Sequence, residues 1–160
     1  MARRRKVFIS YQHKDLQKAH GFNLLRWNKN VKVDCVGRHL LSPVDSTNEQ
    51  YIKSKIKEVM HGTSVTVVLI GKETCDSKWV QWELEQSLKK DNPNGILAIR
   101  LDGANLPEGC PVDNALKEAG AEFIEWDAHS FGPAIERAAL AAGRARAIMC
   151  GTTGGGSCSR

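Results

Sequence analysis

The sequence predicts an α/β fold in which a parallel β-sheet carries helices on both of its faces. Three observations lead to this prediction. Short apolar segments of strand type alternate with longer segments whose apolar residues recur at helical spacing. Val65–Ile70 is apolar at every position except Thr66, which is typical of a strand buried on both faces. The chain has 160 residues, enough for one domain with a substantial core.

The elements can be assigned in order along the chain. Apolar runs, bounded by polar or turn residues, predict strands at Val7–Ser10, Val31–Val36, Val65–Ile70, Ile96–Leu101 and Glu122–Trp126. Apolar residues three or four positions apart predict helices at Leu16–Trp27, Ile52–Met60, Ser77–Lys90, Val112–Ala119 and Pro133–Ala147. Ser42–Gln50 is predicted to be a polar loop, and Asp76 or Ser77 to cap the third helix. This alternation predicts a flavodoxin-like sheet of five parallel strands in the order 2-1-3-4-5.

The composition is that of a globular protein with a basic N-terminus. We divide the chain into a basic N-terminal extension at residues 1–6, one domain at 7–147 and a Gly/Ser-rich flexible tail at 148–160. The net charge is +5, and part of it lies in Arg3–Lys6, which we interpret as a solvated terminus rather than a nucleic-acid contact. No apolar run approaches the ~20 residues of a membrane helix, so we expect no membrane partner.

Cysteine and histidine usage argues against a disulfide framework and against a metal centre. The five cysteines are odd in number and include no C-x-x-C pair, so free thiols in a reducing cytoplasm are expected. The five histidines lack the spacing of zinc ligands. We therefore expect no metal and no cofactor.

Three common functions of such a sheet lack their residues here. A phospho-acceptor receiver needs acidic residues after the first strand and an Asp after the third, where this chain has Ser10-Tyr11-Gln12 and Gly71-Lys72. The residues after Tyr11 are poor in Ser, Thr and Gly, which argues against a flavin-phosphate loop. Neither G-x-G-x-x-G nor a complete P-loop occurs.

The residues that remain resemble a TIR domain. The resemblance rests on Val7–Tyr11 with Asp15, the loop Ser42–Asn48, and above all VTVVLIGKETCDSKWVQWELEQSL, which begins at Val65. Within the TIR superfamily the chain looks most like the ThsB proteins of Thoeris anti-phage defence. The resemblance covers about residues 6–140.

This resemblance implies an enzyme that uses NAD⁺ as its substrate and cleaves the nicotinamide–ribose bond, with Glu83 as the catalytic residue. In the ThsB branch the implied product is a cyclic ADP-ribose-type signal, and we expect it to act on a separate effector protein. Hydrolysis and cyclisation stay open, as does homo-oligomerisation. The alternative is a non-catalytic TIR-like module that binds proteins or senses nucleotides.

The residues of the third helix also favour Glu83 over its neighbour Glu85. Val80, Leu84 and Leu88 are predicted to form the core stripe, and Glu83 flanks it without a helical ion-pair partner. Glu85 is predicted to pair with Lys89 on the surface. A carboxylate can stabilise the oxocarbenium-like charge that develops on the sugar.

Five further residues are candidates for substrate binding. Ser10 and Tyr11 follow the first strand, where ligands of α/β sheets bind. Trp79 is expected to stack on a base, with core packing as its alternative role. Asp45 and Asn48 lie in the loop that by resemblance borders the nucleotide, and turn formation or helix capping is their alternative role.

Overall fold

The protein is an α/β domain with one parallel sheet, as the alternation of elements predicts. The computed structural model describes residues 5–24, 35–38 and 48–143. Its strands pair in the order β2-β1-β3-β4-β5, and every pairing is parallel. The strands are β1 (Arg5–Ser10), β2 (Cys35–Arg38), β3 (Val65–Ile70), β4 (Gly95–Arg100) and β5 (Glu122–Glu125).

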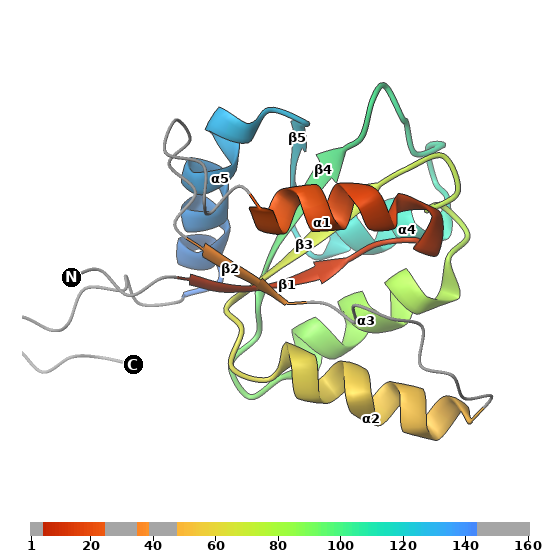
Figure 1. Cartoon of the computed structure of the whole chain (residues 1–160), viewed down its shortest axis with the longest axis vertical. Helices are drawn as coiled ribbons and strands as arrows, with labels where there is room; N and C mark the ends of the chain where they lie inside the picture. Colours follow the sequence, from red (N-terminus) through yellow and green to blue (C-terminus); the bar gives the residue numbers. More distant parts are fainter. Residues whose placement is uncertain (1–4, 25–34, 39–47, 144–160) are drawn as a thin grey trace, which may run out of the picture.

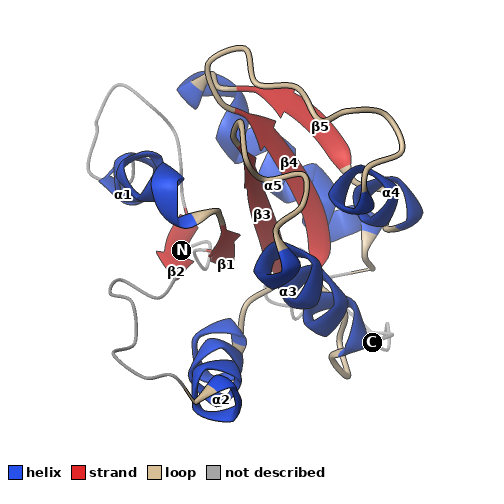
Figure 2. Ribbon diagram, turned by 90° about the vertical axis from the view of Figure 1, so that its right-hand side faces the viewer, coloured by secondary structure: helices blue, strands red, loops and turns tan. Residues whose placement is uncertain are grey.

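Helices cover both faces of the sheet (Figures 1 and 2). The short 3₁₀ helix η1 (His13–Asp15) leads into α1 (Leu16–Leu24), and α1 lies on the same face as α5 (Ala128–Ala141). The opposite face carries α2 (Glu49–Met60), α3 (Lys78–Lys89) and α4 (Pro111–Glu118). None of the helices in the described ranges is both long and apolar enough to span a bilayer.

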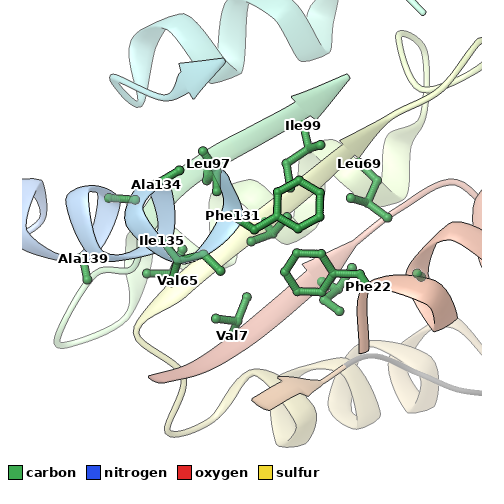
Figure 3. Close-up of a cluster of buried hydrophobic side chains, with 14 of the residues drawn as sticks. Val7, Phe22, Val65, Leu69, Leu97, Ile99, Phe131, Ala134, Ile135 and Ala139 are labelled. Atoms are coloured by element: carbon green, nitrogen blue, oxygen red, sulfur yellow. The ribbon is translucent and has the colours of Figure 1, made fainter. Parts of the chain in front are cut away.

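The larger half of the core lies between the sheet and the helices α1 and α5. Figure 3 shows Phe22 of α1 and Phe131 of α5 over side chains of the central strands, and their ring centroids are 5.3 Å apart. All six residues of β3 are fully buried, as an apolar run on both faces predicts. Burial of one large apolar side chain stabilises a fold by ~1.5–3 kcal/mol, so this layer fixes the positions of the strand ends.

Helix α5 differs most from its predicted bounds. We expected it at Pro133–Ala147, but it begins at Ala128 and ends at Ala141, with Pro133 inside. Asp127 caps it by accepting a hydrogen bond from the His129 amide. Phe131 in the early turns is fully buried against Trp126, which offsets the backbone hydrogen bond that the proline removes. Gly143, at φ +74°, follows the helix end, where glycine is the favoured residue.

Smaller differences concern the boundaries of other elements. Strand β1 begins two residues before Val7, because Arg5 forms a bidentate ion pair with Glu136 of α5. Strand β2 continues to Arg38, whereas residues 31–34 of its predicted span lie outside the described residues. Helix α2 begins at Glu49, inside the predicted loop. The remaining predicted bounds agree to within one residue in the described ranges.

Candidate functional site

Glu83 lies beneath the carboxyl end of the first strand. Helix α3 follows the central strand β3, so its N-terminus starts at the carboxyl edge of the sheet. Ser77 caps this helix by accepting a hydrogen bond from the Val80 amide. Val80 and Leu84 then pack against the sheet, which turns the Glu83 side chain toward β1. The carboxyl edge is where α/β sheets bind their ligands.

Ser10 is the partner of the Glu83 carboxyl group. It is the last residue of β1, it is fully buried, and its Oγ donates a hydrogen bond to Oε2 of Glu83. Side chains alternate along a strand, so Ser10 faces α3 while Ile9 faces α1. The sequence predicts that these two residues lie at the same sheet edge, and the structure joins them by a hydrogen bond.

The surroundings of Glu83 disfavour its charged form. Burial raises the pKa of Glu83 to about 8, although the hydrogen bond from Ser10 lowers it. Tyr11 lies close by, and both its own burial and the charge of Glu83 raise the pKa of its phenol to about 12. A carboxyl group with a pKa near neutrality, at a ligand-binding edge, has the properties of a functional residue.

The burial of Glu83 follows from a buried stripe that differs from the predicted one. We expected Val80, Leu84 and Leu88 to form the stripe, but Leu88 is 40 % exposed. Ser87 is fully buried instead, and its Oγ lies 2.6 Å from Oγ1 of Thr66 in β3. Glu83 precedes Ser87 by one helical turn and therefore shares its face. The small residue Ser87, four positions after Glu83, is the feature of the sequence that is consistent with Glu83 facing the sheet.

Glu85 behaves as the sequence predicts. It is exposed and forms an ion pair with Lys89 one turn later on α3. Two glutamates only two positions apart on one helix therefore have different environments, because Glu83 is partly buried against a serine whereas Glu85 is in solvent.

Trp79 lines a groove between α2 and α3, and Asn48 lies at the N-terminus of α2. Trp79 is 39 % exposed and packs edge-to-face on Trp82, with ring centroids 6.0 Å apart. Both tryptophans line a groove of about 300 Å³ between α2 and α3, together with Glu49, Lys53 and Lys78. Asn48 caps α2 by accepting a hydrogen bond from the Tyr51 amide, so its predicted capping role is present. Asp45 lies outside the described residues.

The expectation of free thiols is wrong for one pair of cysteines. Cys75, in the loop before α3, forms a disulfide with Cys110, which caps α4. Their Cα atoms are 5.9 Å apart, a separation that a disulfide spans. The parallel sheet brings the starts of α3 and α4 together at its carboxyl edge, whereas 35 residues separate the two cysteines in the sequence. Spacing along the chain therefore gave no signal for the pair.

Comparison with known proteins matches this chain to one family. The model of the family described as "Thoeris protein ThsB, TIR-like domain" matches residues 8–106, a range that includes Ser10, Glu83 and the groove between α2 and α3. A curated protein of Bacillus cereus (strain MSX-D12) is 29 % identical over 103 residues and is named "Putative cyclic ADP-D-ribose synthase ThsB1". The match covers 61 % of this chain and about half, 52 %, of that relative. Because the family model matches more than half of the sequence, the chain belongs to the Thoeris ThsB family of TIR-like domains.

Proposed function

We propose that this protein cleaves the bond between nicotinamide and ribose in NAD⁺, with Glu83 as the residue that stabilises the reacting sugar. The observation that carries the proposal is the environment of Glu83, a partly buried carboxyl group held by Ser10 at the carboxyl edge of the sheet. A glutamate needed only for solubility would remain in solvent, as Glu85 does. Burying a carboxyl group is unfavourable, and such an arrangement persists where function requires it.

The chemistry requires little beyond a placed carboxylate. Nicotinamide leaves a cationic precursor as a neutral base, so no general acid has to protonate it. Positive charge then develops on the ribose ring, as in glycoside hydrolysis. In a site from which water is largely excluded, one carboxylate near that charge stabilises the transition state more than it could in water. The hydrogen bond from Ser10 fixes the orientation of Glu83 before the substrate arrives.

The product is proposed to be an ADP-ribose-type signal, in a cyclic form, that a separate effector protein recognises during anti-phage defence. Support comes from the Bacillus cereus relative, which is named "Putative cyclic ADP-D-ribose synthase ThsB1", and from the Thoeris family match. Cyclisation requires a nucleophile from the substrate itself to reach the sugar before water does. Residues that close the Glu83 site against water would decide between the cyclic product and hydrolysis.

The test compares two glutamine variants on the same helix. Glu83→Gln keeps the size and hydrogen-bonding oxygen of the side chain but removes its charge, and we expect a loss of ~10²–10³ in the rate of NAD⁺ cleavage. Glu85→Gln is the matched control and should retain the parent rate, because its carboxylate faces solvent. Mass spectrometry of nicotinamide and nucleotide products is the measurement, with protein from uninfected and from phage-infected cells.

The result also distinguishes catalysis from the alternative function. If Glu83→Gln cleaves NAD⁺ as fast as the parent protein, the catalytic role is rejected. If the parent releases no nicotinamide even from infected cells, the protein-interaction or nucleotide-sensing module becomes the better account. Circular dichroism of each variant checks that the fold is retained.

A further inference from the structure

A second concave feature lies at the same sheet edge, on the side of α1. We call it the edge cavity; its volume is about 240 Å³. The segments that follow β1, β3 and β4 supply its walls, so it lies where parallel sheets bind ligands. Its lining residues are Lys14, Asp15, Lys18, Gly71, Lys72, Glu73, Leu101, Asp102 and Ala104.

Asp15 is an acidic residue of this cavity for which the described residues supply no side-chain partner. It is partly buried, and its carboxylate accepts no hydrogen bond and forms no ion pair with any residue in the described ranges. Burial, together with the nearby charge of Glu73, raises the pKa of Asp15. A partly buried carboxylate of this kind is stabilised by any hydroxyl group that donates to it.

Gly71 fits closely against this carboxylate. A Cβ atom at residue 71 would lie 2.2 Å from Oδ2 of Asp15, so a side chain there would displace the carboxylate. The backbone of Gly71 does not have the positive φ that only glycine adopts readily. The absence of a side chain at residue 71 leaves space, and the Asp15 carboxylate occupies that space at the cavity.

Two of the three lysines that line the cavity form ion pairs with acidic residues. Lys14 pairs with Glu73 at 2.7 Å, and Lys18 pairs with Asp102 at 3.0 Å. Lys72 forms no ion pair within the part of the chain that the structure describes. The cavity thus offers one hydroxyl acceptor, Asp15, and one ammonium group that is free to meet an anion. No group of three or more described His, Cys, Asp or Glu side chains could hold a metal ion there.

Tyr11 connects the edge cavity to Glu83. Its pKa responds to the charge of Glu83, which places its phenol near that carboxyl group. Its ring also packs on the buried cluster that contains Leu101, and Leu101 is a wall of the edge cavity. Strands β1 and β3 are neighbours, so the residues after Ser10 and those after Ile70 lie side by side. The edge cavity and Glu83 therefore both lie at the carboxyl ends of neighbouring strands.

We propose that the edge cavity binds the adenosine ribose and its phosphate, with Asp15 accepting from the ribose hydroxyls and Lys72 facing the phosphate. The proposal rests on the proposed NAD⁺-cleaving function, since it assigns the second nucleotide half of that substrate. Acidic side chains bind ribose hydroxyls at the edges of other parallel sheets by the same chemistry. Asp15 would act as a binding residue at a distance from the bond that is cleaved.

The test uses adenosine 5′-monophosphate as the probe, because it carries the ribose and phosphate without the nicotinamide half. Isothermal titration calorimetry should show that the parent protein binds it. Asp15→Asn should weaken binding by about tenfold or more, the effect of losing hydrogen bonds to a charged acceptor. Gly71→Ala should weaken it as well by displacing the carboxylate. Asp91→Asn, at the exposed loop after α3, is the matched control and should bind like the parent.

The outcomes separate this proposal from the proposed function. The parent failing to bind the monophosphate at millimolar concentration, or Asp15→Asn and Gly71→Ala both binding like the parent, would overturn the edge-cavity assignment. If the parent cleaves no NAD⁺ but binds the probe through Asp15, the cavity assignment stands while the proposed function fails. If it cleaves NAD⁺, Asp15→Asn should raise KM with little change in kcat.

Discussion

At the scale of single residues, the difference between Glu83 and Glu85 is a matter of two positions on one helix. Both are glutamates near the same strand ends. Glu85 forms an ion pair with Lys89 on the surface, whereas Glu83 is partly buried and accepts a hydrogen bond from Ser10. The environment, and not the residue type, makes Glu83 suited to chemistry. Its pKa of about 8 leaves the free protein largely with a neutral carboxyl group at neutral pH.

This pKa predicts how the proposed NAD⁺ cleavage depends on pH. If the ionised form of Glu83 is required, kcat/KM should rise about tenfold per pH unit below about pH 8 and then level off, because kcat/KM reports the free enzyme. The positive charge of bound NAD⁺ favours the carboxylate, so the midpoint of kcat should lie at a lower pH. Initial rates of nicotinamide release between pH 5.5 and 9.5 measure both. A flat kcat/KM across this range would contradict the role of Glu83.

The sequence could predict the candidate residues but only part of their arrangement. Glu83 and Ser10 were both singled out, and the structure brings them together. The apolar pattern of α3 does not predict the partial burial of Glu83. It assigns Leu88 to the buried face of the helix, whereas in the structure Leu88 is exposed and the small polar Ser87 is buried. Trp79 and Trp82 are three positions apart on α3, so helical spacing accounts for their contact. The groove that they line also requires Glu49 and Lys53 of α2, and the pattern within α3 does not reveal the position of that helix.

At the scale of elements, the close approach of α5 to the sheet depends on one glycine. A Cβ atom at Gly95, the first residue of β4, would lie 2.0 Å from the carbonyl oxygen of Ala138 in α5. Small residues on both sides let the helix backbone reach the strand. Main-chain atoms cannot rotate away as side chains do, so a side chain at this position would separate the two elements.

We therefore expect Gly95→Ala to destabilise the protein by ~1–3 kcal/mol, the usual effect of overpacking a core. Urea denaturation followed by circular dichroism measures the change. Gly71→Ala is the matched control, because the atoms it meets belong to the Asp15 side chain, which can move. Its loss of stability should be clearly smaller. Equal stability of Gly95→Ala and the parent would show that α5 can shift without loss.

The bounds of α5 also show where element prediction from sequence fails. The spacing of apolar residues predicts that this helix starts at Pro133. In the structure the helix begins five residues earlier, since Phe131 is buried against Phe22 and Trp126. The packing partners of Phe131 come from α1 and from the segment after β5. Contacts between distant segments decide such a boundary, and a pattern within one segment cannot reveal them.

At the scale of the whole molecule, the parallel α/β architecture was predictable because strand and helix patterns alternate along the chain. Val65–Ile70 is the clearest element, and it forms the central strand β3 with all of its residues buried. The disulfide between Cys75 and Cys110 was not predictable, because only the finished sheet brings the two cysteines together. The sheet thus places at one edge the groups that the sequence distributes over several loops.

The same edge couples the stability of the whole protein to one proton. The ordinary pKa of glutamate is 4.5, and burial raises that of Glu83 to about 8, so the folded protein holds a proton that the unfolded chain has released. Below about pH 4.5 both states are protonated and Glu83 carries no penalty. Between about pH 4.5 and 8 the folded state binds one proton more than the unfolded chain, so the free energy of unfolding decreases as the pH rises. Above about pH 8 the folded protein holds a charged, partly buried carboxylate and the decrease ends.

Glu83→Gln removes this dependence, because an amide does not ionise. We expect the variant and the parent to have similar melting temperatures near pH 4.5, and the variant to melt higher at pH 9. A gain of at least 1 kcal/mol there corresponds to about 2–4 °C for a chain of this size. Tyr11 titrates only near pH 12 and does not interfere in this window. Differential scanning calorimetry at several pH values provides the measurement, with Glu85→Gln as the control for losing an exposed carboxylate from the same helix. If the difference in melting temperature between Glu83→Gln and the parent stays constant from pH 4.5 to 9, Glu83 is solvated like Glu85. Its environment would then give no support for a functional carboxyl group.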